Sequence, residues 1–402
     1  MKPWLAVVGI GADGWEGLGA AARARIAEAR LLVGGERHLA LIPPVKSTAE
    51  KLAWLRPLAD TIPIIAGRRG QSVAVLASGD PLCYGVGALL ARHFPAEEMI
   101  VLPSSSAFSL AAARLLWPLE ECVTLSLHAR ALDQIRLYLA PQRRILALST
   151  DGATPGQLAR MLQRSGWGPS EMIVLEQLGG PDERCIVARA AEWSAARCDD
   201  LNIVALQCRA APDAVLLSRR SGLPDNAFRH DGRLTKRAVR AATLAQLSPL
   251  PGQLLWDIGA GSGSVAIEWL RADDRMRAIA IERDAARAAL ITANAAALGV
   301  PQLELRIGTA PEALTGLPAP DAVFIGGGVS DDRIWDTAWQ SLKPGGRLVA
   351  NAVTLGGEAA LLRRHAAHGG ELTRIAVAQA EAEHGFWRQA MPVTQLAVSK
   401  PR

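Results

Sequence analysis

Residues 254–270, LLWDIGAGSGSVAIEWL, constrain the possible folds of this chain more than any other stretch. An apolar run leads into three closely spaced glycines, Gly259, Gly261 and Gly263, and then into a helix-compatible segment. In an open α/β sheet, a glycine-rich turn between the first strand and the first helix lies at the carboxyl ends of the strands, where nucleotide ligands bind. The sequence therefore predicts a nucleotide-binding α/β domain built around this turn.

The rest of the chain repeats this alternation of strands and helices in two unlike halves. With 402 residues, the chain is long enough for two domains. Apolar strand-like runs alternate with helical segments throughout, which predicts α/β domains with mainly parallel sheets. The runs CIVARAAEW and LNIVALQC indicate a partly antiparallel end to the first half. We place the boundary near residue 212, inside the proline-containing segment 209–228, giving domains 1–211 and 212–402.

Composition excludes several classes of protein. Half of the residues are hydrophobic and 21% are charged, as in globular enzymes. No apolar run reaches the roughly 18 residues that a membrane span needs. The five cysteines show no CxxC spacing, so we expect neither a disulfide framework nor a metal site, and we expect a cytoplasmic protein. We interpret five histidines as structural, namely His38, His128, His365, His368 and His384.

The spacing of the glycines in residues 259–263 argues against a dinucleotide. The dinucleotide fingerprint is GxGxxG, and Ser264 stands where its last glycine belongs. Asp257, just before the turn, would repel a pyrophosphate but would suit a cationic group such as an α-amino group. Glu282, at the end of the next predicted strand, could accept hydrogen bonds from ribose hydroxyls.

Two later segments, after the third and at the fourth predicted strand of the second half, extend this series of motifs. GTAPEAL follows the third predicted strand, and DAVFIGGG brings Asp321 and Gly326 to the end of the fourth. Together these features resemble the class I (Rossmann-like) methyltransferase fold, which implies S-adenosyl-L-methionine as the cofactor. The resemblance implies that the cofactor is bound by Asp257, Gly259, Ala260, Gly261, Ser262, Gly263, Glu282, Gly308, Thr309, Ala310 and Gly326.

The segment before this domain's first helix, GLPDNAFRHDGRLTKRAVR, resembles the decarboxylating methyltransferases of the cobalamin pathway. Thr235 is the expected helix N-cap, and the resemblance places it at the cofactor. A basic group that includes Arg237 and Arg240 surrounds this segment. Guanidinium groups bind carboxylates in bidentate fashion, so a polycarboxylate substrate would suit it. The candidates for substrate handling are Asp225, Arg229 and Lys236.

The first half opens with its own glycine turn, VVGIGADG, which formally matches GxGxxG but lacks a well-placed acidic partner. Three later segments, ASGDPLCYGVG, PSSSAFSLAAARL and LEQLGGPDER, change its interpretation. With the opening turn they resemble the tetrapyrrole methylase family, which implies a two-lobed fold that also binds S-adenosyl-L-methionine. The cofactor-binding residues implied here are Gly9, Gly11, Gly79, Asp80, Pro81, Ser104, Ser105 and Ser106.

These resemblances imply a bifunctional enzyme with one S-adenosyl-L-methionine per domain. The first domain would methylate C5 of a precorrin, a small polycarboxylate tetrapyrrole. The second would methylate C15 and decarboxylate the C12 acetate. We expect a homo-oligomer that binds neither membrane nor nucleic acid.

Two alternatives stay open. One is a nucleic-acid methyltransferase, suggested by the net charge of +5 but not by the five Phe and two Tyr residues. The other is a non-catalytic tetrapyrrole-binding protein that senses S-adenosyl-L-methionine.

Overall fold

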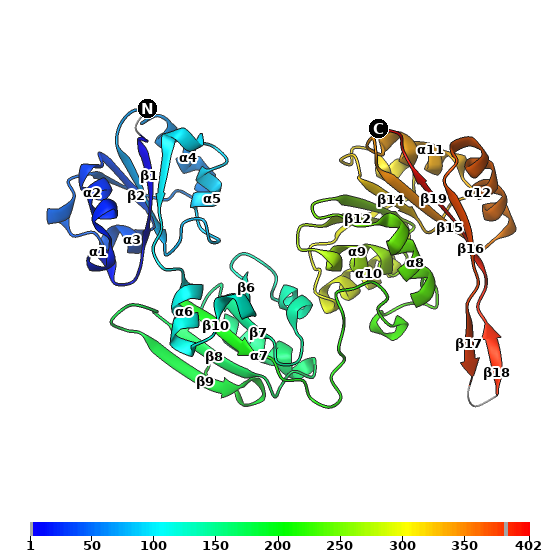
Figure 1. The fold of residues 1–402 in the computed structure, drawn as a ribbon, viewed down its shortest axis with the longest axis horizontal. Coiled ribbons are helices and arrows are strands. Elements are labelled where there is room, and N and C mark those ends of the chain that lie inside the picture. Colours follow the sequence, from blue (N-terminus) through cyan, green and yellow to red (C-terminus); the bar gives the residue numbers. More distant parts are fainter. Residues whose placement is uncertain (1–2, 382–384) are drawn as a thin grey trace. The chain divides into compact units, whose positions relative to one another are not determined.

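The computed structural model describes residues 3–381 and 385–402, so the prediction for His384 lies outside the described residues. The chain forms two compact units (Figure 1). The first contains the residues up to 130 and residues 138–215, and the second contains residues 131–137 and 216–402. The chain passes from one unit to the other between Val215 and Leu216, inside segment 209–228. The functional boundary near residue 212 stays a prediction.

The first unit begins with a parallel five-stranded sheet in the order β3-β2-β4-β1-β5. Successive residues of a strand face opposite sides of a sheet, and both sides are apolar here. Val8 and Ile10 pack with Ile26 of α2, whereas Val7 packs with Ile65 of α4. Helices therefore cover both faces. The elements are β1 (Leu5–Ile10), α1 (Gly14–Gly17), α2 (Ala20–Glu28), β2 (Leu31–Gly34), α3 (Glu36–Ala40), β3 (Glu50–Ala53), α4 (Thr61–Ala66), β4 (Val73–Ser78), α5 (Gly87–Leu90) and β5 (Met99–Leu102).

A second sheet, in the order β6-β7-β10-β8-β9, completes the first unit. Only β6 and β7 run parallel; β10, β8 and β9 pair antiparallel with their neighbours, as the sequence predicts for the end of this half. Phe108 of α6 packs against Leu146 and Ile203 on one face. The two sheets form the predicted two lobes. The elements are α6 (Ala107–Leu115), β6 (Cys122–Ser126), β7 (Arg144–Leu148), α7 (Thr154–Arg164), β8 (Glu171–Glu176), β9 (Arg184–Arg189) and β10 (Asn202–Gln207).

The second unit contains a seven-stranded sheet in the order β13-β12-β11-β14-β15-β19-β16. The first five strands are parallel, and β19 and β16 add an antiparallel edge. Trp256 of β11 packs with Trp335 of α11 and Leu361 of α12 on one face, and α9 packs on the other. This is the predicted Rossmann-like arrangement. The elements are α8 (Arg237–Leu247), β11 (Leu254–Ile258), α9 (Ser264–Ala272), β12 (Arg277–Glu282), α10 (Ala285–Ala297), β13 (Glu304–Ile307), β14 (Ala322–Ile325), α11 (Asp332–Ser341), β15 (Arg347–Ala352), α12 (Leu355–His368), β16 (Glu371–Ile375) and β19 (Val393–Ser399).

A separate hairpin, β17 (Ala378–Glu381) and β18 (Phe386–Gln389), stands between β16 and β19 in the chain and projects beyond the sheet of this unit (Figure 1). Within residues 3–381 and 385–402, no helix is both long and apolar enough to cross a membrane. The same residues hold no cluster of three or more His, Cys, Asp or Glu side chains arranged to bind a metal ion.

Candidate active sites

The glycine turn of the second unit leads from β11 directly into α9. Gly259, Gly261 and Gly263 adopt φ angles of +72°, +60° and +77°, which side chains disfavour. A Cβ atom on Gly259 would also lie 2.8 Å from the backbone nitrogen of Gly327. The turn after β11 therefore needs glycine because its backbone is left-handed and approaches the turn after β14 closely.

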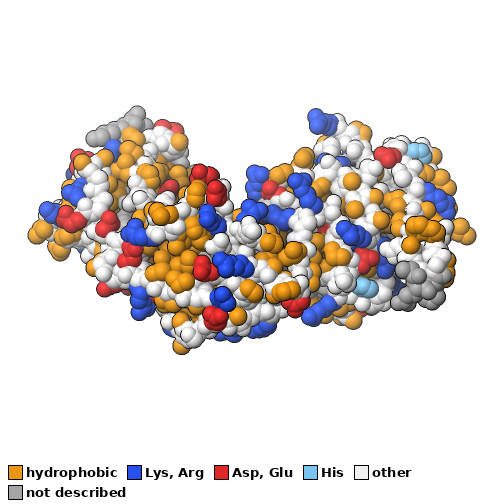
Figure 2. Space-filling view, turned by 60° about the horizontal axis from the view of Figure 1, so that its bottom comes forward, with side chains coloured by type: hydrophobic (Ala, Val, Ile, Leu, Met, Phe, Trp, Pro, Cys, Tyr) orange, Lys and Arg blue, Asp and Glu red, His pale blue; other side chains and the backbone are white. Residues whose placement is uncertain are grey.

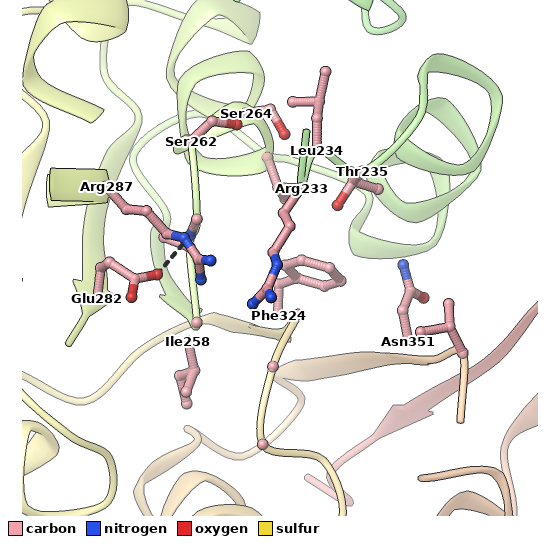
Figure 3. Close-up of a pocket in the computed structure, with 18 of the residues that line it drawn as sticks. Arg233, Leu234, Thr235, Ile258, Ser262, Ser264, Glu282, Arg287, Phe324 and Asn351 are labelled. Carbon is pink, nitrogen blue, oxygen red and sulfur yellow. Dashed lines mark hydrogen bonds between the residues drawn. The ribbon is translucent and has the colours of Figure 1, made fainter. Parts of the chain in front are cut away.

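Glu282, the last residue of β12, fixes this turn from the neighbouring strand (Figure 3). Its Oε2 accepts a hydrogen bond from the backbone N–H of Gly261 at 2.9 Å, and its Oε1 accepts one from the N–H of Asp284 at 3.0 Å. The side chain is only 4% exposed. The carboxylate is held rigidly, with lone pairs left to accept hydrogen bonds from a ligand.

Both turns and Glu282 border a cavity of about 980 Å³ at the carboxyl ends of the parallel strands. Most of the residues that the sequence assigned to the cofactor line it together. They are Thr235, Gly259, Ala260, Gly261, Ser262, Glu282, Gly308, Thr309, Ala310 and Gly326. Exposed glycine backbone, a fixed carboxylate and apolar walls such as Ile258 and Phe324 form a set of groups that fits S-adenosylmethionine, which has an amino-acid end, a ribose and an adenine.

Asp257 and Gly263 do not line this cavity. Asp257 is 1% exposed beneath the turn, where its Oδ2 accepts a hydrogen bond from the N–H of Ala266 at 3.0 Å. Its Oδ1 has no partner among the described residues. Burial raises its pKa to about 7; the Ala266 N–H opposes this shift and the charge of Glu282 adds to it. Asp257 was expected to contact the cationic end of a ligand. Because it does not line the cavity, this arrangement does not provide that contact directly.

The residues proposed for substrate handling are only partly brought together. Lys236 lines the cavity, whereas Asp225 and Arg229 do not. Asp225 is occupied by Arg240, whose Nη1 lies 3.2 Å from its Oδ1. Arg229 has an exposed side chain, and its backbone N–H donates to Asn294 at 2.8 Å.

Two expectations around α8 are wrong, as is one about β14. Lys236, not Thr235, is the N-cap residue of α8. Arg240 does not surround an entrance, because it is fully buried and its Nε donates to Glu268 at 2.6 Å. Asp321 precedes β14 and pairs with Lys343 at 2.8 Å, so it lies at the opposite end of that strand from Gly326.

Further cavity residues were not identified from the sequence. Arg233 points into the cavity between Glu282 and Asn351, and Arg287 lies beside it (Figure 3). Arg287 pairs with Asp231 at 2.9 Å. The position of Arg233 two residues before Thr235 could have suggested it. The sequence around the lining residues Val377, Ala390 and Met391 contains no motif that would indicate a binding site. They reach the cavity because they belong to the connection between β16 and β19.

The first unit has its own cavity, of about 500 Å³. The predicted cofactor residues that line it are Gly11, Gly79, Asp80, Ser105 and Ser106. They combine glycine backbone, hydroxyl groups and a carboxylate. Asn202 of β10 and the two residues that follow β7, Ser149 and Thr150, add polar groups. This polar, glycine-rich set also fits the methyl donor.

Three predicted residues lie outside this lining, namely Gly9, Pro81 and Ser104. Gly9 serves close packing, because a Cβ atom there would lie 1.9 Å from the carbonyl oxygen of Gly79. Ser104 donates its backbone N–H to that same oxygen at 3.1 Å. Gly9 and Ser104 therefore shape the turn at Gly79, which borders the cavity.

His38 also lines this cavity, although the sequence gave it only a structural role. Its Nε2 lies 2.8 Å from Ser78 Oγ and 3.0 Å from Arg37 Nη2. Burial, together with the charge of Arg37, lowers its pKa to about 4. His38 is therefore neutral near pH 7, as a hydrogen-bonded structural histidine would be.

Comparison with known families matches both units. A family described as tetrapyrrole (corrin/porphyrin) methylases matches residues 5–193, and a precorrin methyltransferase domain family matches residues 226–400. A Sinorhizobium protein named precorrin-6Y C(5,15)-methyltransferase [decarboxylating] is 49% identical over 402 residues, which cover 100% of this chain and 97% of that protein.

Two shorter Salmonella typhimurium proteins are similar to parts of the chain. One, named cobalt-precorrin-7 C(5)-methyltransferase, is 33% identical over 45% of this chain and 88% of its own length. The other, named cobalt-precorrin-6B C(15)-methyltransferase (decarboxylating), is 39% identical over 29% of this chain and 60% of its own length. The full-length similarity decides the family: the chain belongs to the decarboxylating precorrin-6Y C(5,15)-methyltransferases, which are S-adenosylmethionine-dependent enzymes.

Proposed function

We propose that this chain methylates C5 and C15 of precorrin-6Y and decarboxylates its C12 acetate, with C5 methylation in the first unit and the other two steps in the second. The observation that carries the proposal is one glycine-bordered cavity in each unit, in a chain similar over its full length to an enzyme named for this combined activity. Separate relatives named for the C5 step and for the decarboxylating C15 step support the division. The proposed boundary near residue 212 falls between the two family matches.

We further propose one S-adenosylmethionine per unit, which supplies an electrophilic methyl group when it is bound. In the second unit the backbone of Gly259 and Gly261, the Glu282 carboxylate and the segment 308–310 would hold it. In the first unit Gly11, Gly79, Asp80, Ser105 and Ser106 would do so, with Ser104 contributing only through the turn that it supports. Asp257 remains a proposed indirect contributor beneath the turn.

The chain's own contribution is to bind, orient and exclude water. The charged residues lining the second cavity are Arg233, Lys236, Glu282, Arg283 and Arg287, so cations outnumber carboxylates four to one there. Such a lining favours a polycarboxylate substrate. Gly326, Gly327 and Gly328 carry no side chains that would block a flat ring edge. Loss of carbon dioxide leaves electrons that the conjugated ring can delocalise, so the proposal requires no strong base.

Arg233 is the residue that we propose for a substrate carboxylate in the second cavity. It projects into the space that Glu282 and Asn351 border (Figure 3). Lys236 is the proposed second cation, while Asp225 and Arg229 would act only outside the cavity. Replacing Arg233 with Ala should weaken precorrin binding about tenfold and leave S-adenosylmethionine binding to the first unit unchanged.

The two alternative functions are less well supported. Lys and Arg side chains are interspersed with acidic and apolar ones on the face that Figure 2 shows, whereas nucleic-acid binding favours a continuous basic surface. A non-catalytic carrier would not need a donor cavity in each unit. A homo-oligomer and a cytoplasmic location also belong to the proposal.

The test is mass spectrometry of precorrin-6Y after incubation with the full chain and S-adenosylmethionine. Two added methyl groups and one lost carbon dioxide would support the proposal. Tight, salt-sensitive RNA binding without precorrin turnover would favour the nucleic-acid alternative. Precorrin binding without formation of S-adenosylhomocysteine would favour the carrier.

A further inference from the structure

The hairpin β17–β18 is unusual because its two strands pair with each other and with no other described strand. Isolated two-stranded hairpins are marginally stable in water, so this hairpin would gain stability from a molecule that packs against one of its faces. Phe386 is 53% exposed and Trp387 is 69% exposed, and the two point to opposite faces because they are adjacent in one strand.

The register shows which face continues the cavity of the second unit. The described pairs are Ala378 with Gln389, Gln379 with Arg388, Ala380 with Trp387 and Glu381 with Phe386. The N–H of Ala390 donates to the carbonyl of Val377 at 2.9 Å, so these two residues extend the same register by one pair. Both Val377 and Ala390 line the cavity.

Because side chains alternate along a strand, the face that carries Val377 and Ala390 also carries Gln379, Arg388, Glu381 and Phe386. The ion pair between Arg388 Nη1 and Glu381 Oε1, at 2.8 Å, joins two of these residues and agrees with this assignment. We call this set of six residues the inner face. Trp387 lies on the opposite face.

The inner face combines two chemistries that a flat polycarboxylate needs. Phe386 offers an aromatic ring, and the Arg388 side chain is 76% exposed. A guanidinium group has five N–H donors, so the bond to Glu381 leaves others for a second carboxylate. The cavity must hold the methyl donor and the ring edge that reacts, so the remaining part of a macrocycle would extend beyond it, and the inner face continues from the lining residues Val377 and Ala390.

We propose that the inner face of the β17–β18 hairpin is the outer wall of the tetrapyrrole site, where Phe386 packs against the conjugated ring and Arg388 pairs with a peripheral carboxylate of the substrate. This inference rests on the proposed function for the identity of the substrate. It adds a surface beyond the cavity to the substrate-binding site and makes both residues determinants of specificity.

The test compares Phe386→Ala and Arg388→Ala with the control Trp387→Ala, all in the full chain. Binding of uroporphyrin, a flat tetrapyrrole polycarboxylate, is measured by fluorescence titration, which needs no turnover. We expect each inner-face variant to weaken binding about tenfold. Trp387→Ala should change it less than about twofold, and the affinity for S-adenosylmethionine should stay unchanged in all three.

Glu381→Gln separates carboxylate binding from damage to the hairpin. This variant breaks the ion pair but keeps Arg388, so the proposal expects uroporphyrin binding to stay equal or become tighter. A loss as large as that of Arg388→Ala would overturn it.

Two other results would also overturn the inference. Equal effects of Phe386→Ala and Trp387→Ala would show that the faces are not distinguished. Dissociation of an oligomer by Phe386→Ala, seen in sedimentation, with unchanged uroporphyrin binding would assign the face to a second copy of the chain. Failure of the wild-type protein to convert precorrin-6Y would instead count against the proposed function, because the binding comparison does not depend on it.

Discussion

Each unit has a glycine turn at the end of the first strand of a parallel sheet, and both turns approach other backbone closely, yet their glycines differ in whether they line a cavity. In the second unit Gly259 and Gly261 have positive φ angles and present their backbone to the cavity. In the first unit Gly9, a residue of β1, does not line the cavity and permits close contact with Gly79, while Gly11 lines it. A glycine motif thus indicates that something lies close to the backbone at that position. The motif alone does not show whether this neighbour is a ligand or another part of the chain.

The walls of the two cavities also differ in origin. The second cavity lies at the carboxyl edge of a single sheet, and one carboxylate, Glu282, braces its turn. The first draws on two sheets, since Gly79 follows β4 and Asn202 begins β10. We therefore expect a substitution at Gly9, which is outside the lining, to act on stability, and a substitution at Glu282, which is part of the lining, to act on ligand binding.

The largest effect is expected from Gly9→Ala. Its Cβ atom would lie 1.9 Å from Gly79 O and 2.6 Å from Ser104 N, both of which are backbone atoms that cannot move aside cheaply. We expect a loss of about 3 kcal/mol in the free energy of unfolding of the first unit, and a transition lowered by about 6–12 °C in scanning calorimetry. The control Gly19→Ala has no atom within 4 Å of the added Cβ, so it should lose only about 1 kcal/mol or less, the cost of Ala in place of Gly at the N-cap of α2. An unchanged transition in Gly9→Ala would contradict the packing role.

The next effect, on binding, is expected from Glu282→Ala. This variant removes the acceptor for the N–H groups of Gly261 and Asp284 and the group proposed for the ribose. We expect about a 100-fold loss in affinity for S-adenosylmethionine at the second site, measured by titration calorimetry. At S-adenosylmethionine concentrations near the wild-type dissociation constant, methylation at C15 should therefore fall by up to about 100-fold, whereas C5 methylation continues.

The exposed residue Glu304, at the start of the neighbouring strand β13, offers a matched control. Glu304→Ala should leave both binding events intact. If Glu282→Ala abolished both methylations equally, the two cavities would not act independently and the division of labour would be wrong.

The sequence predicted the α/β class, the mainly parallel sheets and the antiparallel end of the first half, and most of the residues that it assigned to the cofactor line the two cavities. Those features depend on local patterns, such as the glycine spacing at residues 259–263 and the strand-terminal Glu282. It misplaced Arg240, because nothing in the basic run around it shows that Glu268 neutralises it in the core. It missed Arg233 and the hairpin residues Val377 and Ala390 because their place at the cavity depends on tertiary structure.

The smallest expected effect concerns Asp257, which lies beneath the glycine turn of the second unit and influences its stability. Its carboxyl group is buried in the second unit with a pKa of about 7, whereas an unfolded aspartate titrates near its usual 3.8. Between these two pH values the folded state keeps a proton that the unfolded state has released. The free energy of unfolding therefore falls as pH rises from about 4 to about 7 and then stays lower. Asp257→Asn removes this dependence while its amide oxygen can still accept the Ala266 N–H.

Chemical denaturation of the wild type and Asp257→Asn at several pH values between 5 and 8 measures the difference. Above pH 7 the variant should be more stable by about 1 kcal/mol, since the amide NH₂ takes a position without a partner and offsets part of the gain. At pH 5, where the wild-type carboxyl group is protonated in the folded state and ionised in the unfolded state, the sign should reverse and the wild type should be the more stable protein. The same variant tests the proposed link to the cofactor. Because Asp257 lies beneath the lining, affinity for S-adenosylmethionine should change less than about threefold. A loss of tenfold or more would show that the carboxylate turns toward the cationic end of the ligand when the site is filled.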